Sequence, residues 1–578
     1  MESISYLAAL PSEILQLIIE HTHASGHWPL AQTCKHLYLN SQPILGRHRK
    51  AYQEFRISCD LDPQTVPNLL WSALSPGAAS IDAWHVREFE VWTDRINNDP
   101  WEVDADTGDL WIVEGRQPWS FPDDDADYFF DKLYKVPDFF PKDDTYYVQA
   151  REELKTGADT FLKAFLLAHL PRMQALRYMR SPESEQVNFK NLCLMIYWCK
   201  LAGIWLPGLE ALQKVYVGVN SRRIGDTTID GTILRPDPPS RELGEFCALL
   251  CLPNLSEVYF AHLDGNSDIS SEITDLFPDG LQPLLNKTSP VQTIIIDKLE
   301  ASLSEQLMEF LTKSPSSLKN LAIRFHPFNE YGNCRRDDTS DGKQRSQELT
   351  QKLAQHQHSS LQRLCFYTEA VRDGLSDWNW VAPSQRAIFD DIRVAYFYWT
   401  MMEEEMASRA AAVRSRSELL DQLVQVFRSQ FPATIEMIYF NGFSRSRSIF
   451  QSAEFDDAPL DYIDDVVEAM ITSERYKNLK AVHLRDIQAE ATPDETPDYF
   501  PFPKTMKAAE ERGVYVHVKG SKPPPWFSFK GEFIPIPTRD CLVTGQFLPE
   551  EEDPYLVHCA WEDQGMPVAL SGAESAQT

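Results

Sequence analysis

The chain has 578 residues, more than one hydrophobic core usually serves, so its length predicts several domains or a repeat architecture. Hydrophobic residues make up 43% of it, which excludes a chain that is mostly disordered. The 85 acidic residues outnumber the 55 basic ones and give a formal net charge of -30, which disfavours binding to nucleic-acid phosphates and to anionic membrane surfaces.

The N-terminus lacks a basic leader followed by an apolar run, because Glu2 and Glu13 interrupt it. No stretch of about eighteen apolar residues occurs anywhere in the sequence. The 10 cysteines lie mostly within apolar runs, as is typical of small core residues in a reducing compartment. We therefore expect a soluble protein of the cytoplasm, the nucleus or both, with no membrane partner.

The first predicted element is a short amphipathic helix that begins at Pro11, because the first turn of a helix tolerates a missing N–H group. Glu13 then lies at the positive end of the helix dipole. The apolar residues at positions 14, 15, 18 and 19 fall on one face, and the polar stretch at 24–27 ends the helix.

A second helix is predicted to begin near Pro29 and to end at Pro43. Its apolar stripe contains Leu30, Cys34, Leu37 and Tyr38. Two helices this short cannot enclose a core. The module is therefore expected to need a partner surface, either from elsewhere in the chain or from another protein.

This region resembles the F-box over about forty residues. The likeness rests on Leu-Pro-x-Glu-Ile-Leu at 10–15, Thr-Cys-Lys-x-Leu-Tyr at 33–38 and Pro-x-Leu at 43–45. Residues 21–28 depart from the family pattern, which has a more regularly apolar helix there. The alternative interpretation is a helical hairpin that only buttresses the next domain.

The resemblance implies a partner and a function. F-box modules bind the Skp-family adaptor of cullin-RING ubiquitin ligases, so the chain is expected to recognise targets for ubiquitin-dependent degradation and not to be an enzyme. An F-box at residues 8–48 would contact the adaptor and, through it, a cullin. The positions that match the contact motif of the family are Leu10, Pro11, Ile14 and Leu15. Leu37 and Tyr38 are further matches later in the sequence.

Residues 49–157 are predicted to form an acidic, aromatic connector without a regular period. Three successive carboxylates, Asp123 to Asp125, suggest a cation site, but the spacing of a calcium loop is missing and no metal is expected. A solvated acidic loop explains them better. Aromatic side chains are expected to anchor this loop, because they bury large areas: Trp111, Trp119, Phe129, Phe130, Tyr146 and Tyr147.

Residues 158–520 contain a recurring phrase of the form apolar-x-x-apolar-x-apolar that follows a helical segment. A degraded copy is also predicted around 392–398. The eight clear copies begin at Met173, Leu212, Leu255, Val291, Leu318, Leu361, Ile435 and Leu479.

Strands joined by crossing helices run parallel, and stacked units bury their apolar faces against one another. The pattern resembles the divergent leucine-rich-like arrays that follow the F-box in many large fungal proteins. The expected fold class is therefore α/β, with a small all-helical F-box and an irregular leucine-rich-repeat-like solenoid of parallel strands. An ordinary α/β domain is the alternative.

The sequence ends with a Pro-rich extension at 521–569 and a polar tail at 570–578 that is predicted to be disordered. Phosphate loops, nucleophile elbows and zinc motifs are missing from the sequence, so no cofactor or catalytic residue is assigned. Two alternatives to a ligase adaptor stay open. One is a protein-interaction scaffold without a ligase, and the other is an enzyme with an unrecognised site in 158–520.

Overall fold

The computed structural model describes residues 10–92, 158–179, 187–219, 241–265, 286–299, 303–325, 338–368, 394–398, 433–441, 459–485 and 502–519, with a few shorter pieces between them. The chain forms two compact units. The first is built mainly from Met1–His262 and the second mainly from Gln292–Phe533.

The first unit opens with a helical region. The first predicted helix is present as α1 (Ser12–His21). At its start, the Leu15 amide donates a hydrogen bond of 3.0 Å to the Pro11 carbonyl. The short η2 (Ala24–Gly26) follows, then α2 (His27–Gln32) and α3 (Lys35–Phe55).

This region differs from its predicted form in two places. The stretch predicted as one helix from Pro29 is divided at Cys34, whose extended backbone separates α2 from α3. The predicted end at Pro43 is wrong, because α3 continues through Pro43 to Phe55. The predicted domain boundary between residues 48 and 49 therefore falls inside a helix.

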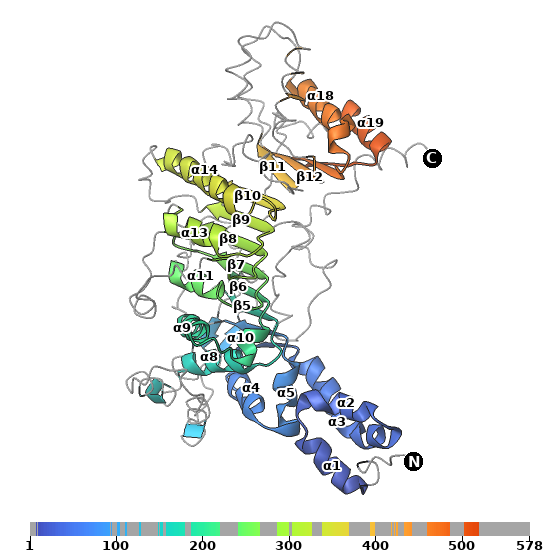
Figure 1. Ribbon diagram of the computed structural model, residues 1–578, viewed down its shortest axis with the longest axis vertical. Helices are drawn as coiled ribbons and strands as arrows, with labels where there is room; N and C mark the ends of the chain where they lie inside the picture. Colours follow the sequence, from blue (N-terminus) through green and yellow to red (C-terminus); the bar gives the residue numbers. More distant parts are fainter. Residues whose placement is uncertain are drawn as a thin grey trace. The chain divides into compact units, whose positions relative to one another are not determined.

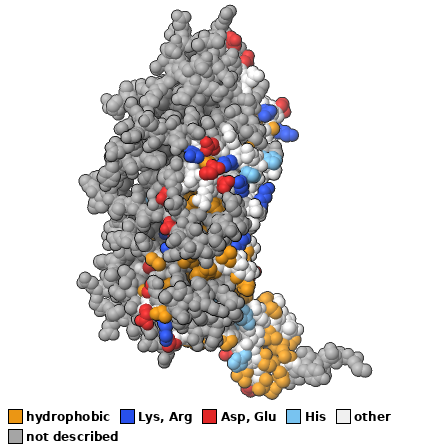
Figure 2. Space-filling view, turned by 60° about the vertical axis from the view of Figure 1, so that its left-hand side comes forward, with side chains coloured by type: hydrophobic (Ala, Val, Ile, Leu, Met, Phe, Trp, Pro, Cys, Tyr) orange, Lys and Arg blue, Asp and Glu red, His pale blue; other side chains and the backbone are white. Residues whose placement is uncertain are grey.

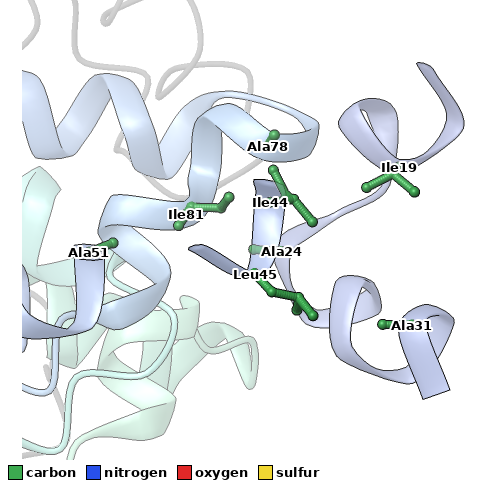
Figure 3. Packing of buried hydrophobic residues seen from close by; sticks show 8 residues of the cluster. All are labelled: Ile19, Ala24, Ala31, Ile44, Leu45, Ala51, Ala78 and Ile81. Carbon is green, nitrogen blue, oxygen red and sulfur yellow. The ribbon is translucent and has the colours of Figure 1, made fainter. Parts of the chain in front are cut away.

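Side chains of α1, η2, α2 and α3 share a core with η3 (Gly77–Ser80) and α5 (Ile81–His85), as Figure 3 shows. Both η3 and α5 come from the stretch predicted as a connector. Part of the partner surface that the short helices were expected to need therefore lies within the chain. The buried members of this core are Ile19, Ala24, Ala31, Ile44, Leu45, Ala51, Ala78 and Ile81.

Gly77 allows α1 and η3 to approach closely. Its φ is +62°, and a Cβ atom at this position would lie 2.4 Å from the carbonyl oxygen of Glu20 at the end of α1. We expect Gly77→Ala to lower the free energy of unfolding by about 2–4 kcal/mol, since the left-handed backbone costs about 1–2 kcal/mol and the clash adds to it. Urea unfolding of the full chain measures the change.

Gly203 provides the matched control, because its φ is +67° and a Cβ atom there would meet nothing within 4 Å. Gly203→Ala should therefore lower stability only by the backbone term of about 1–2 kcal/mol. If the two alanine variants had the same free energy of unfolding, the close approach at Gly77 would not affect stability.

The described strands of the first unit follow the order β1-β2-β5-β6-β7, and each neighbouring pair is parallel. A separate antiparallel pair lies in the predicted connector, formed by β3 (Trp101–Val103) and β4 (Leu110–Ile112). The other elements are β1 (Ile57–Cys59), α4 (Thr65–Leu74), β2 (Glu88–Val91), α8 (Thr160–His169), β5 (Ala175–Met179), α9 (Val187–Ala202), α10 (Pro207–Ala211), β6 (Lys214–Val219), α11 (Leu243–Leu249) and β7 (Glu257–Ala261).

Successive strand residues point to opposite faces, and the two faces of this sheet differ in chemistry. One register row is entirely apolar and fully buried: Phe89, Leu176, Val215 and Val258. The next row lies on the opposite face and is polar or aromatic: Glu90, Arg177, Tyr216 and Tyr259. The alternation explains why the predicted phrase has apolar residues at every second strand position.

In the second unit, every described strand pair from β8 to β14 is parallel. Figure 1 shows α13 and α14 on one side of β8, β9 and β10. The described elements are β8 (Thr293–Leu299), α13 (Glu305–Lys313), β9 (Asn320–Phe325), α14 (Asp338–His356), β10 (Arg363–Thr368), β11 (Val394–Tyr398), β12 (Met437–Asn441), α18 (Pro459–Thr472), η7 (Glu474–Tyr476), β13 (Ala481–Arg485), α19 (Pro503–Arg512) and β14 (Tyr515–Lys519).

The prediction that the recurring phrases form parallel strands is confirmed for the described residues. Each of the eight phrases contains a strand, and the degraded copy around 392–398 contains β11, which pairs parallel with β10 and β12. The array also begins earlier than the predicted residue 158, because β1 and β2 belong to the same parallel series.

A backbone hydrogen bond recurs at the start of the strands in each unit. In the first unit, the amide of Gln213 donates to the carbonyl of Gln174 at 2.9 Å, and the amide of Ser256 donates to the carbonyl of Gln213 at 2.7 Å. In the second, the amide of Gln362 donates to the carbonyl of Lys319 at 2.7 Å. Within each unit, the residue that precedes a strand therefore bonds to the equivalent residue before the neighbouring strand.

Several predictions concern residues that lie outside the described ranges. These are the burial of Phe129, Phe130, Tyr146 and Tyr147, the exposure of Asp123 to Asp125, the side chains of Trp111 and Trp119, and the Pro-rich extension and tail. Within the described ranges, none of the helices has both the length and the apolar character needed to cross a membrane.

Candidate partner-binding face

Exposed apolar side chains are concentrated on α1, α2 and α3. Of the eleven large hydrophobic residues that are exposed in the described part of the chain, six lie on these helices. Their exposed fractions range from 43% to 57%. We call these six residues the apolar face: Ile14, Leu17, Trp28, Tyr38, Leu39 and Tyr52.

Figure 2 shows hydrophobic side chains gathered over the N-terminal helical region. Monomeric soluble proteins rarely expose large apolar areas of this kind, and such areas often mark binding sites. Aromatic residues are frequent among the strongest contacts of protein interfaces, and this face contains one Trp and two Tyr residues.

The six residues predicted to bind a partner divide into two groups. Pro11, Ile14 and Tyr38 are exposed, and Leu10 is half-buried. Leu15 and Leu37 are 0% and 2% exposed, so both belong to the interior in this structure. Their side chains stabilise the helices that carry the face, and their contact with a partner stays a prediction.

Sequence reasoning missed four members of the apolar face: Leu17, Trp28, Leu39 and Tyr52. In α1 the buried residues are Leu15 and Ile19, which are one helical turn apart, so an apolar Leu17 lies outside the buried stripe. Apolar residues outside the core-facing stripe were the signal that could have identified this face. Trp28 is the last residue of the stretch at 21–28 that departs from the family pattern, and no periodicity marks it.

Three histidines link the helices beside this face. His27 belongs to α2, His48 to α3 and His85 to α5. The Nδ1 atom of His27 lies 2.7 Å from Nε2 of His48, and Nδ1 of His48 lies 2.7 Å from Nε2 of His85. His27 is 0% exposed and is the residue before Trp28, so these contacts fix the position of α2.

The sheet of the first unit contains buried ionic groups. Arg177 lies 2.9 Å from Glu88 and 3.0 Å from Glu90, and burial raises the pKa of Glu90 to about 7 while Arg177 lowers it. A general acid or base must reach its substrate, whereas Glu90 is fully buried. An internal ion pair accounts for this shifted group without any catalytic role.

A second ionic group joins α8 to the ends of β1 and β2. The Lys163 ammonium lies 2.7 Å from the Asp60 carboxylate and 2.9 Å from that of Asp159. Asp60 also accepts a hydrogen bond of 2.9 Å from the Trp92 amide. All three charged side chains are at most 5% exposed, so this group connects elements of the interior.

Among the residues that the structure describes, no three His, Cys, Asp or Glu side chains are arranged to hold a metal ion. No model of a known protein family matches the chain, and no curated protein matches it at a significant level.

Proposed function

We propose that the protein is the substrate-recognition adaptor of an SCF-type (Skp, cullin, F-box) ubiquitin ligase. Its N-terminal helical region would be an F-box that binds the Skp-family adaptor, and through that adaptor a cullin. Ubiquitin transfer would be carried out by the partner enzymes. Such a protein would act in the cytoplasm, the nucleus or both.

The observation that carries this proposal is the apolar face on α1, α2 and α3. An internal core already fills the space between these helices and α5, yet six large apolar residues of the same helices remain exposed. A helix that is apolar on more than one side has more than one packing partner. The F-box resemblance at residues 10–45 supplies the identity of the external partner.

We propose that the parallel strand-helix array is a divergent leucine-rich-repeat-like solenoid that holds a protein target. The recurring phrases and the recurring backbone hydrogen bonds support a repeat more than an ordinary α/β domain. Holding the target beside a charged ubiquitin carrier would raise the effective concentration of its lysines.

Affinity purification of the tagged full chain tests the proposal. A ligase adaptor should recover the Skp-family protein and a cullin together. Recovery of the Skp-family protein without any cullin would instead support a scaffold that works outside a ligase. Recovery of neither would contradict the F-box assignment, provided that circular dichroism shows the chain to be folded.

A further inference from the structure

The hydrogen bonds of the three histidines determine where each proton lies. The Ile19 carbonyl can only accept, so the Nε2 atom of His27, at 2.9 Å, carries a proton. In a neutral ring, Nδ1 of His27 must then accept from Nε2 of His48. By the same reasoning, Nδ1 of His48 accepts from Nε2 of His85.

An added proton breaks this row of bonds at two of the three ring nitrogens that could accept it. A proton added to Nδ1 of His27 or of His48 would place two N–H groups face to face and break a bond. The remaining position is Nδ1 of His85, which is buried and has no hydrogen-bond partner among the described residues. A proton there would leave a buried charged donor without an acceptor.

The surroundings also oppose a positive charge on these rings. Burial is the main cause that lowers the pKa of all three histidines, to about 4 for both His48 and His85. The neighbouring arginines lower these pKa values further. The titratable and charged groups around the row are His23, Arg47, Tyr52, Arg87, Arg172 and Asp82, with Lys50 and Glu54 acting on Asp82.

We propose that His27, His48 and His85 form an acid-sensitive latch, which holds α2 and α3 against α5 while the rings are neutral and releases them when the rings take up protons. Opening would disorganise the apolar face, because α2 and α3 carry four of its six residues. The inference goes beyond the proposed function and does not depend on the identity of any partner.

The pH window follows from the difference between folded and open states. The pKa of an open histidine ring is near its ordinary value of 6.5, whereas burial lowers the pKa of the latched rings of His48 and His85 to about 4. Between these values the open state binds more protons, so acidification favours opening. The latch is therefore complete above about pH 6.5 and is lost progressively as the pH falls toward 4.

Hydrogen exchange of the full chain, followed by mass spectrometry from pH 7.5 to 5.5, tests the latch. Protection factors are used because they remove the direct effect of pH on exchange. For peptides of α2 and α3, we expect protection to fall by about a hundredfold, since each of two rings contributes about tenfold per pH unit below its open-state pKa. Peptides of β9 and α13 in the second unit provide the internal reference.

The double variant His48→Gln/His85→Gln keeps a donor and an acceptor at each position but cannot titrate in this range. Its α2 and α3 peptides should lose most of the acid dependence. The control His36→Gln changes an exposed histidine of α3 and should behave as the wild type does. The proposal would be contradicted if wild-type protection did not change with pH. It would also be contradicted if both variants changed the acid dependence of the α2 and α3 peptides equally.

If the double variant does not fold, the exchange of the histidine C2 hydrogens in the wild-type chain gives the titration of each ring. The pKa of His48 and of His85 should lie near 4, below the ordinary histidine value of 6.5. A pKa near 6.5 for both rings would also contradict the proposal, because the row would then accept protons freely.

Discussion

Replacing Lys163 by Met should destabilise the first unit by about 3–5 kcal/mol, because it removes one partner from a buried ion pair. The ammonium is completely buried and lies within 3 Å of two buried carboxylates, those of Asp60 and Asp159. Without it, two negative charges remain in a medium that solvates them poorly. The expected signature is faster hydrogen exchange in α8 and β1.

Lys480→Met is the matched control. Lys480 lies 2.6 Å from Glu436, but 68% of its side chain is exposed. An exposed pair contributes at most about 1 kcal/mol, so this variant should be nearly as stable as the wild type. Equal stability of the Lys163 and Lys480 variants would contradict the prediction that removing the buried ammonium group is costly.

A compensated variant separates charge from packing. Changing Asp60 and Asp159 to Asn together with Lys163→Met removes both uncompensated carboxylates. This variant should recover part of the lost stability, because buried polar groups without charge are less costly than isolated ions. No recovery would mean that Lys163 acts mainly by filling space.

The strands could be predicted from the sequence because each one buries a face under helices. That requirement places apolar residues at fixed positions of the phrase, as at Leu318, Leu321 and Ile323, which are all fully buried. The degraded copy around 392–398 also contains a strand, β11. The parallel direction follows from the helices that connect successive strands.

One further copy of the phrase was overlooked. Val86, Phe89 and Val91 have the same spacing and are all fully buried, and the segment that they define, 86–91, includes all of β2. Glu88 and Glu90 alternate with them, so the segment was interpreted as part of an acidic connector. These carboxylates lie on the opposite face of the sheet, where Arg177 neutralises them.

The continuation of α3 through Pro43 could not be predicted from local preference. Proline removes a hydrogen bond to the carbonyl four residues earlier, which is that of Leu39. Because Leu39 and Pro43 are both exposed, water can reach that carbonyl. The burial of Ile44 and Leu45 in the core then holds the helix together beyond the proline. Tertiary packing outweighs the local signal here.

The histidine row has no sequence signal either. His27, His48 and His85 are separated by 21 and 37 residues, so only the packing of α2, α3 and α5 brings them together. The distinction between Leu15 and Ile14 has a similar origin. Both are apolar neighbours in the motif, and only the position of η3 and α3 relative to α1 decides which one is buried.

The apolar face makes a quantitative prediction for partner binding. Burying one large apolar side chain contributes about 1.5–3 kcal/mol, so Leu17 and Leu39 together should contribute about 3–6 kcal/mol to an interface that covers them. Each 1.4 kcal/mol corresponds to about tenfold in affinity. We therefore expect Leu17→Glu/Leu39→Glu to weaken binding of the Skp-family adaptor by at least about a hundredfold, as measured by calorimetry with the full chain.

The matched control is Leu201→Glu/Ile204→Glu. These residues lie at the end of α9 and just beyond it, and they are 52% and 57% exposed, so the same charge is introduced at equally accessible sites outside the apolar face. This variant should bind the adaptor as the wild type does. Since all four substituted residues are exposed, neither variant should change the melting temperature much. Equal loss of binding in both variants, or unchanged binding in the first, would show that the apolar face is not the adaptor site.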